Sequence, residues 1–457
     1  MSQTIFARDA LLPEGWARDV TVQIGSDGRI SSVTQADAKP DRAEEVGILL
    51  PAPANIHSHG FQRAMAGLTE GRGDSPTDSF WTWRRVMYRF LDQLTPEHVE
   101  AITAFVQMEM LEAGYAASVE FHYLHHQPGG VPYASLSEMS ERVAGAADAS
   151  GIGLTLLPVL YEYGGLDQRA LGPGQIRFGN DPERFAILVE GAERALSPLP
   201  HDTVLGVAPH SLRAVSSQGL SQAATLRPDG PIHMHIAEQI PEIEEVFAAT
   251  GVQPMEWLLD NAQVDARWCL IHCTHMTHDE TVALARTGAT AGLCPITESS
   301  LGDGIFNGID YLSANGRIGI GSDSNIRISL SEELRTLEYS QRLTSNRRAV
   351  FATPDKSTGR MLFEHALKGG AAAAGRDCGA IAPGKQADLL TLDPGSVHLV
   401  NRTQDQLLDS FIFAGDDSMV RDVWSAGRHV VRGGQHKDHD RLTAAYRGVI
   451  ERLSSEI

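Results

Sequence analysis

The chain has 457 residues and a formal net charge of −20 at neutral pH, with 58 acidic residues against 38 basic ones. This length can form one large domain with a smaller one beside it, and the negative charge argues against nucleic acid or an anionic membrane as a partner. The four cysteines suggest no disulfide framework, no apolar run reaches roughly 18 residues, and the first residues lack the basic and apolar regions of a signal peptide. We therefore expect a cytoplasmic protein with reduced thiols.

Short strands are expected at both ends of the chain. Residues 19–33 hold two strand-like stretches around the turn GSDG, which is typical of a β-hairpin. Strand character returns in residues 387–393 and 420–434. Because the two ends resemble each other and differ from the middle, we predict a small β-sandwich domain built from residues 1–48 and 380–457.

Between these ends, apolar runs alternate with amphipathic stretches. Residues 95–114 and 277–288 each begin with a threonine that can cap a helix and end with a glycine that can terminate one. Alternating strands and helices indicate an α/β fold, and we predict a (β/α)8 TIM barrel for residues 49–379. An open doubly wound sheet is the alternative, but no glycine-rich phosphate loop follows any run. The eight runs are residues 48–59, 116–123, 154–161, 204–211, 232–238, 268–275, 289–295 and 317–323.

Residues that can bind a metal gather at the carboxyl ends of these runs, which converge on one face of a barrel. His57 and His59 end the first run, and alternation along a strand points both side chains the same way. Two histidines from one strand, one from another and a carboxylate predict a Zn²⁺ site with room for water, and Fe²⁺ suits the same ligands. The other candidates are His233, His235 and Glu238 on the fifth run, His272 and His275 on the sixth, and Asp323 on the eighth.

This set of residues resembles the amidohydrolase superfamily. The HxH sequence of the first run, HIAE on the fifth, the histidine of the sixth and GSD on the eighth are similar to its motifs, and residues 379–393 resemble the closing segment of its cytosine-deaminase-like branch. Many relatives hold two metals bridged by a carbamylated lysine, but this chain has no lysine between residues 40 and 355, so we expect one metal ion. The resemblance implies that the ligands are His57, His59, His235 and Asp323.

The same resemblance assigns the catalytic roles. His233 and His235 have the same strand parity, and the HxxE spacing to Glu238 favours His235. Relatives carry their sixth-strand histidine at the position of His272, which leaves His275 a structural role. Asp323 and His272 would orient the water nucleophile and take its proton, and Glu238 would carry a proton to the leaving nitrogen. Such a site hydrolyses a C–N bond at an amidine-like carbon and releases ammonia.

Four further stretches, residues 60–67, 78–90, 120–126 and 209–215, resemble the formimidoylglutamate deiminases of histidine degradation. Enzymes of that family convert N-formimino-L-glutamate and water to N-formyl-L-glutamate and ammonia. A chain of charge −20 needs cations at its site to bind a substrate with two carboxylates, and arginine pairs with a carboxylate through two hydrogen bonds. The substrate residues implied are Gln62, Arg84, Tyr123, His210 and Arg213. Expected outside the site are Arg85, His122, His125 and His126.

Two other functions are compatible with the sequence. One is a different deaminase of the same branch, of the guanine, cytosine or S-adenosylhomocysteine type, with the arginines serving only structure. The other is a non-catalytic relative, although the loss of a ligand or proton carrier that marks such proteins is not seen. By analogy with relatives we also expect a homodimer.

Overall fold

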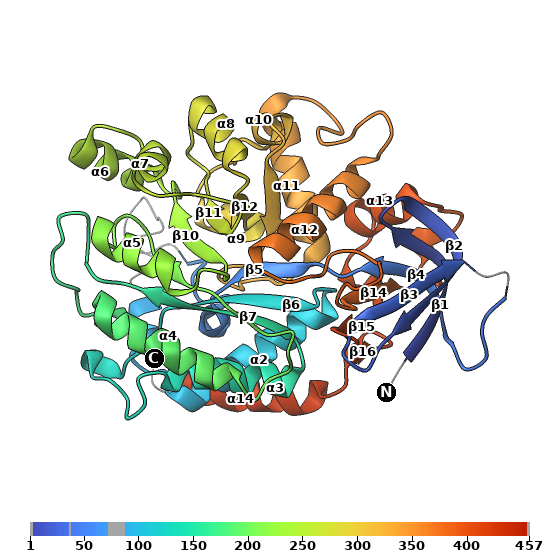
Figure 1. The fold of residues 1–457 in the computed structure, drawn as a ribbon, viewed down its shortest axis with the longest axis horizontal. Coiled ribbons are helices and arrows are strands. Elements are labelled where there is room, and N and C mark those ends of the chain that lie inside the picture. Colours follow the sequence, from blue (N-terminus) through green and yellow to red (C-terminus); the bar gives the residue numbers. More distant parts are fainter. Residues whose placement is uncertain (1–2, 36–37, 72–86, 455–457) are drawn as a thin grey trace.

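A barrel of parallel strands forms the larger part of the molecule. The computed structural model describes residues 3–35, 38–71 and 87–454, and the barrel occupies the part of Figure 1 away from the N-terminus. Every residue of the second, third and fifth barrel strands is buried, as expected for parallel strands covered on both faces. The barrel strands are β5 (Ala54–Ser58), β6 (Ala117–His122), β7 (Gly153–Leu160), β8 (Val204–Leu205), β9 (Ala208–Pro209), β10 (Ile232–Ile236), β11 (Trp268–His272), β12 (Thr290–Leu293) and β13 (Arg317–Ile320).

Two isolated parallel bridges close the barrel. Parallel pairing runs from β5 to β8 and from β10 to β13, with β9 paired to β7. The bridge between Val207 and Ile232 joins the two sets at one side, and the bridge between Ser58 and Asp323 joins them at the other. Each of the eight predicted runs contributes a strand to the barrel, or in the fourth run two short ones. The predicted (β/α)8 barrel is therefore confirmed.

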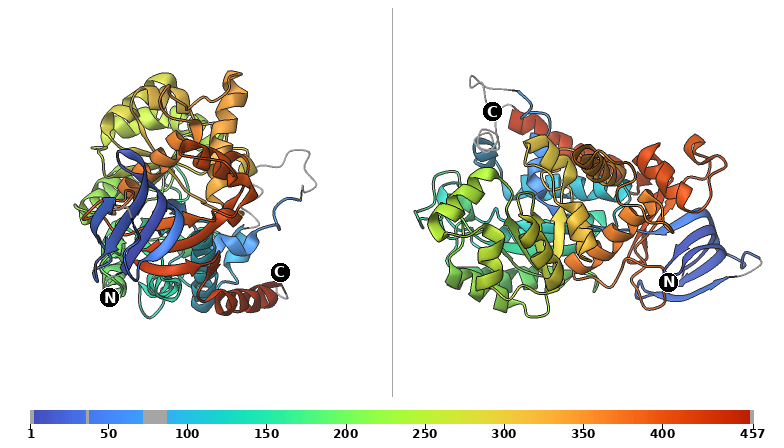
Figure 2. Two further views of the ribbon diagram at one scale, coloured as in Figure 1. Left: turned by 90° about the vertical axis from the view of Figure 1, so that its right-hand side faces the viewer. Right: turned by 90° about the horizontal axis from the view of Figure 1, so that it is seen from above.

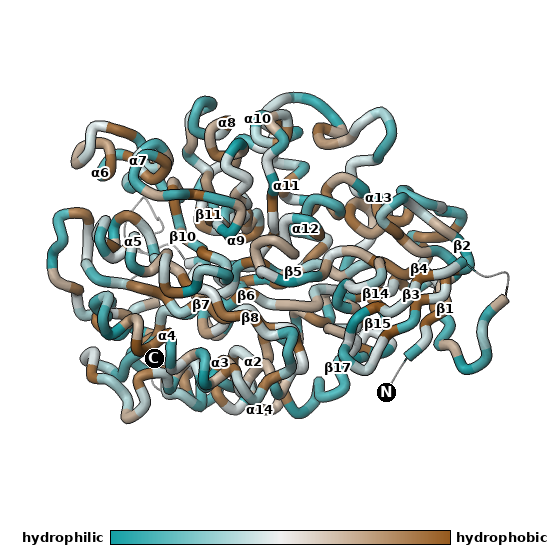
Figure 3. Tube along the Cα trace, in the orientation of Figure 1, coloured by the Kyte–Doolittle hydropathy of each residue, from teal (hydrophilic) through white to brown (hydrophobic). Residues whose placement is uncertain are grey.

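Helices surround the barrel, and their ends are set by the expected residues. Thr95 caps α2 by accepting a hydrogen bond from His98 N at 3.3 Å, and Thr277 caps α8, which ends at the left-handed residue Gly288. Figure 3 shows hydrophilic and hydrophobic residues alternating along helices such as α4, which presents one face to the core. Among the described residues, no helix has the length and apolar character needed to cross a membrane. The helices after the barrel strands are α2 (Pro96–Glu112), α3 (Glu138–Ser150), α4 (Pro182–Leu196), α5 (Ser217–Leu226), α6 (Ile240–Thr250), α7 (Pro254–Asn261), α8 (His278–Thr287), α9 (Pro295–Leu301), α10 (Gly308–Ser313), α11 (Leu330–Ser345) and α12 (Thr358–Ala373).

The two ends of the chain form one sandwich-like sheet beside the barrel. Its eight strands have the order β17-β16-β15-β14-β4-β1-β2-β3, so C-terminal and N-terminal strands meet where β14 pairs with β4 (Figure 2). The predicted hairpin is confirmed, because β2 and β3 pair antiparallel. The sheet encloses its own apolar core around residues such as Val22 and Trp424. Its strands are β1 (Gln3–Leu12), β2 (Gly15–Ile24), β3 (Ile30–Gln35), β4 (Glu44–Pro51), β14 (Leu389–Leu392), β15 (Val420–Ser425), β16 (Arg428–Arg432) and β17 (Gln435–His436).

The first predicted run and the last helix each tie the sheet to the barrel. Residues 48–59 form two strands rather than one: β4 ends at Pro51 in the sheet, and β5 begins at Ala54 in the barrel. Pro51 and Pro53 lack a backbone N–H for strand pairing, which favours a break here. At the other end of the chain, α13 (Asp405–Phe413) follows the sheet strand β14, and α14 (His439–Ser454) packs on α2, where Tyr446 stacks on Phe105 with ring centroids 4.1 Å apart.

Candidate metal and active site

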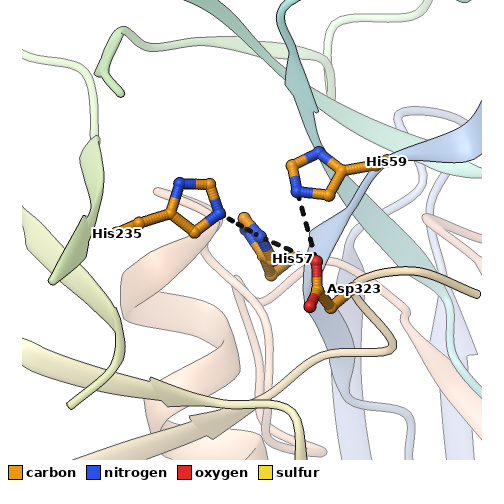
Figure 4. A group of neighbouring side chains, drawn as sticks. All are labelled: His57, His59, His235 and Asp323. Carbon is orange, nitrogen blue, oxygen red and sulfur yellow. Dashed lines mark hydrogen bonds and ion pairs between the residues drawn. The ribbon is translucent and has the colours of Figure 1, made fainter. Parts of the chain in front are cut away.

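Four donor side chains converge at the carboxyl ends of three barrel strands. His57 lies at the end of β5 and His59 directly after it, His235 lies on β10, and Asp323 follows β13 (Figure 4). The Nε2 atoms of His57 and His59 lie 3.3 and 3.2 Å from Asp323 Oδ1, and His57 Nε2 lies 3.1 Å from His235 Nε2. All four donor atoms lie within 4.8 Å of one another, and all four residues are buried. This spacing suits a single ion held by three imidazoles and one carboxylate.

His57, His235 and Asp323 have the protonation states in which such side chains bind a metal. Burial lowers the pKa of His57 to about 3 and that of His235 well below the usual value, so both rings are neutral at physiological pH. Burial alone would raise the pKa of Asp323, but contacts with His57 and His59 hold it well below its ordinary value. Neutral imidazoles and an ionised carboxylate are the ligand forms that bind a divalent cation.

Backbone carbonyl groups fix the orientation of two of the rings. The Nδ1 atom of His59 lies 3.0 Å from the carbonyl oxygen of Phe121, and that of His235 lies 3.2 Å from the carbonyl oxygen of His210. A proton on each Nδ1 satisfies these contacts and leaves the Nε2 lone pair directed at the cluster.

The histidines that the sequence left open take up different positions. His233 is buried with its Nε2 atom 2.8 Å from Ala373 O and is not one of the four clustered donors, whereas His235 is. His272 has its Nε2 atom 3.8 Å from Glu238 Oε1 and 3.9 Å from Asp323 Oδ2. His275 is only half-buried.

Acidic neighbours surround His272 and make it strongly basic. Burial disfavours its charged form, but Glu238, then Glu298 and then Asp323 outweigh that effect and raise the pKa of His272 to about 10. A divalent cation held next to Asp323 would lower this pKa, because the two positive charges would repel each other. His272 is therefore equipped to hold or accept a proton beside the cluster.

Glu238 connects the cluster to the one arginine of the predicted substrate set that the structure describes. Its Oε2 atom lies 3.9 Å from Arg213 Nη2, while its Oε1 atom faces His272. The loop that carries Glu238 is held by Glu242, whose carboxylate accepts the backbone N–H groups of Ala237 and Glu238 at 3.2 and 3.1 Å. A fixed carboxylate between a base and a cation can relay a proton in the pocket.

A pocket lies over the cluster and includes most of the predicted substrate residues. Gln62, Tyr123, His210 and Arg213 all line it, and Gln62 Nε2 donates to the Tyr123 hydroxyl at 2.7 Å. Apolar walls come from Met87, Tyr161, Phe178 and Leu301. Arg84 and Arg85 lie outside the described residues.

Two buried glutamates at the site were not identified from the sequence. Glu298 on α9 lies with its Oε1 atom 3.4 Å from His272 Nδ1 and also accepts the N–H of Cys294 at 2.8 Å. Glu120 on β6 accepts the N–H of Gly60 at 2.6 Å, directly after the ligand His59. Glu298 follows the seventh run and Glu120 interrupts the second, so an acidic residue inside or just after an apolar run was the available signal.

Cys294, His272 and Glu298 also lie within 4.8 Å of one another, but we do not assign a metal to them. Burial raises the pKa of Cys294 well above its usual value and keeps the thiol protonated, whereas metals bind the thiolate.

A (β/α)8 barrel with three histidines and an aspartate at its strand ends defines a metal-dependent hydrolase, and comparisons with known proteins agree. Residues 48–430 match the model of the amidohydrolase family, and residues 2–47 match that of the formimidoylglutamate deiminase HutF, N-terminal domain. The chain is 47% identical to formimidoylglutamate deiminase from Pseudomonas aeruginosa over 98% of its own length and 99% of that protein.

Solved structures show the same architecture. An amidohydrolase from Brucella melitensis superposes with a TM-score of 0.95 and 47% identity, covering 99% of both chains. An adenosine deaminase from Xanthomonas campestris with bound zinc shares the fold, with a TM-score of 0.82 and 21% identity over 99% of this chain and 98% of that one. The chain therefore belongs to the amidohydrolase family and, within it, to the formimidoylglutamate deiminases.

The buried carboxyl group of Glu120 predicts a pH dependence of stability. Burial raises its pKa to about 7, against the opposing effect of hydrogen bonds from Gly60 and Ser58. Between the unfolded pKa of roughly 4.3 and this value, the folded state keeps a proton that the unfolded state releases, so the free energy of unfolding falls as the pH rises. In metal-free Glu120→Gln protein this part of the decline should disappear, as measured by urea unfolding at pH 5, 6, 7 and 8.

The matched control is Glu190→Gln, which replaces an exposed glutamate on α4. It should leave the pH profile of the wild-type protein in place. An identical pH slope in Glu120→Gln and wild-type protein would show that Glu120 is already ionised in the folded state across this range.

Proposed function

We propose that this protein hydrolyses N-formimino-L-glutamate to N-formyl-L-glutamate and ammonia. The observation that carries the proposal is that a single pocket is lined by three members of the four-residue cluster, by the carboxylate of Glu238 and by the guanidinium of Arg213. The three members are His59, His235 and Asp323. The cluster and Glu238 are what hydrolysis of a C–N bond needs, and Arg213 pairs with a carboxylate of the substrate. The full-length similarity to a formimidoylglutamate deiminase supports the same substrate.

The resident metal in this proposal is one Zn²⁺ ion, with Fe²⁺ as the alternative. The three histidines and Asp323 form a donor set that would suit either ion. When bound, such an ion supplies a hydroxide-like nucleophile at neutral pH.

The side chains of the pocket then divide the proton transfers among them. Asp323 and His272, with Oδ2 and Nε2 atoms 3.9 Å apart, hold the attacking water and receive its proton. Glu238, 3.8 Å from His272, delivers a proton to the imino nitrogen so that it leaves as ammonia. The carbon that lost nitrogen keeps the oxygen of water and becomes the formyl group.

The remaining residues bind and orient the substrate. Arg213 binds a carboxylate, while Gln62, Tyr123 and His210 contribute polar groups from the pocket wall. Arg84, the second predicted cation, is proposed from the sequence for the other carboxylate. A homodimer, a cytoplasmic location and the division into residues 1–48 with 380–457 and residues 49–379 also stay predictions.

The substrate is tested by ammonia release. Purified zinc-loaded protein should release ammonia from N-formimino-L-glutamate, and not from guanine, cytosine or S-adenosylhomocysteine. Guanine and cytosine have no carboxylate for Arg213 to bind. S-adenosylhomocysteine has one, but it lies at the end of the molecule opposite the purine amino group that would be hydrolysed. Turnover confined to a nucleobase or nucleoside would replace the proposed substrate while leaving the hydrolytic site in place. No turnover of any of them by protein with one bound metal would reject the deaminase proposal.

Glu238→Gln should keep the fold and the metal but lower kcat by roughly 10²- to 10⁴-fold, the usual contribution of positioned proton transfer. The amide has nearly the same shape as the carboxylate but cannot carry the proton. Metal content by atomic emission and kcat should be measured together, with Glu245→Gln on the exposed face of α6 as the control. A kcat near that of the control would remove Glu238 from proton transfer.

Arg213→Ala should raise KM roughly 10- to 150-fold, because a charge-assisted contact contributes roughly 1.5 to 3 kcal/mol. Kinetics on N-formimino-L-glutamate should be compared with those of Arg286→Ala, which removes an exposed cation from α8. An unchanged KM in Arg213→Ala would show that the substrate carboxylates bind elsewhere.

A further inference from the structure

The closure of the barrel between β5 and β13 is made by the metal ligands' own backbone. The carbonyl oxygen of His57 accepts the N–H groups of Ser322 and Asp323 at 3.1 and 2.9 Å, and the carbonyl oxygen of Asp323 accepts the N–H of His59 at 3.0 Å. Three of the four ligands therefore meet at this closure, which we call the seam. Any shift of one strand along the other would move His57 and His59 relative to Asp323.

A chain of buried polar side chains crosses the seam. Asn55 Nδ2 donates to Ser322 Oγ at 2.6 Å, Ser322 Oγ donates to Asn325 Oδ1 at 2.6 Å, and Asn325 Nδ2 donates to Ser58 Oγ at 3.1 Å. All four residues are fully buried, and all their side-chain nitrogen and oxygen atoms have hydrogen-bond partners. These four residues, Asn55, Ser58, Ser322 and Asn325, are the seam network.

Each member of the seam network is next to a ligand or two residues away from one. Asn55 also accepts the N–H of Ser322 at 3.1 Å through its Oδ1 atom, so one amide group bonds both the backbone and the side chain of the residue before Asp323. Ser58 lies between His57 and His59 in the sequence and receives the far end of the network. The network thus fixes the register of the two strands at the ligands.

The backbone at the seam is held in a conformation that needs such support. Asp323 and Asn325 have φ values of 45° and 55°, in the left-handed region that costs free energy for a residue with a side chain. A Cβ atom at Gly321 would lie 2.7 Å from His57 N, so the two strands approach more closely than a side chain at this position would allow. Strained residues of this kind persist when the surrounding contacts determine their conformation.

We propose that the seam network positions His57, His59 and Asp323 before the metal binds and thereby sets the metal affinity of the protein. The inference rests on the proposed function for the presence of a metal, but not for the identity of the substrate. The members of the seam network provide no donor atom to the cluster themselves. They act on the segments of chain that carry the ligands. They are positioning residues.

The proposal predicts an effect on metal affinity that a purely stabilising network would not have. If it only stabilised the fold, its loss would lower the stability of metal-free and metal-bound protein equally and leave the dissociation constant unchanged. If it presets the ligands, part of the metal-binding free energy must be spent on ordering them once the network is lost, and affinity falls. Loss of groups that support metal ligands commonly weakens binding roughly 10- to 100-fold.

The test is Ser322→Ala in the full-length protein, which removes two of the three side-chain hydrogen bonds of the network without changing a ligand. The dissociation constant for Zn²⁺, measured by competition with a chelator, should rise roughly 10- to 100-fold. The Co²⁺-substituted variant should show altered d–d absorption, because its ligands are less fixed. Both measurements are made without substrate, so they stand even if the proposed substrate is wrong.

The control is Ser150→Ala, which removes a hydroxyl that is as buried as that of Ser322. This hydroxyl donates to Oε1 of Gln107 on α2 at 3.0 Å, away from the cluster. It should lose stability but keep the wild-type Zn²⁺ affinity and Co²⁺ spectrum. The same pattern in Ser322→Ala would overturn the proposal.

Should Ser322→Ala fail to fold, Ser58→Ala tests the other end of the network. It removes the acceptor of Asn325 Nδ2 and one hydrogen bond of Glu120, and it should weaken Zn²⁺ binding in the same direction. Where both variants fold, their combination should weaken binding by less than the product of the single effects, because they interrupt one network. Wild-type affinity in Ser58→Ala would likewise reject the proposal.

Discussion

The convergence of parallel strand ends is the constraint on which the site depends. In a closed parallel barrel the carboxyl ends of all strands meet at one face, so residues as distant in sequence as His57 and Asp323 become neighbours. No local structure could bring these two side chains to 3.3 Å. The covering helices and the sheet from the chain ends serve the site by keeping this barrel closed.

The electrostatics of the cluster follow from that convergence. Burial keeps the rings of His57 and His235 neutral, so they provide no positive charge to balance the ionised Asp323. A divalent cation would place positive charge directly beside this buried carboxylate and would bind the imidazoles as well. The same acidic surroundings raise the pKa of His272, so the features that favour a cation also provide a base. Arg213 then offers the positive charge that an anionic substrate needs in this environment.

The sequence predicted the parts of the molecule that have local or periodic signals. Eight apolar runs separated by capped helices were enough for the barrel, and metal-binding residue types at the run ends were enough for the cluster. The choice of His235 over His233 could not come from periodicity, since both lie on one face of a strand; it came from resemblance. The break at Pro51 was present in the sequence, but one continuous apolar run concealed that it crosses from the sheet to the barrel.

What the sequence could not show is pairing between residues without a motif. Glu298 bonds His272 across 26 positions, and Asn55 bonds Ser322 across 267, and neither pair has a characteristic spacing. In the sequence alone, such asparagine and serine residues cannot be distinguished from ordinary polar residues, because their partners become neighbours only in the closed barrel.

The use of a polar network at the seam has a physical reason. Apolar side chains would fill the space between β5 and β13 and stabilise the closure, but dispersion contacts change little when one strand slides or rotates by a fraction of an ångström. Hydrogen bonds have narrow distance and angle preferences, so a fully satisfied buried network defines one register. Metal ligands need positions accurate to a few tenths of an ångström, and at the seam that accuracy has to come from the two strands that carry three of them.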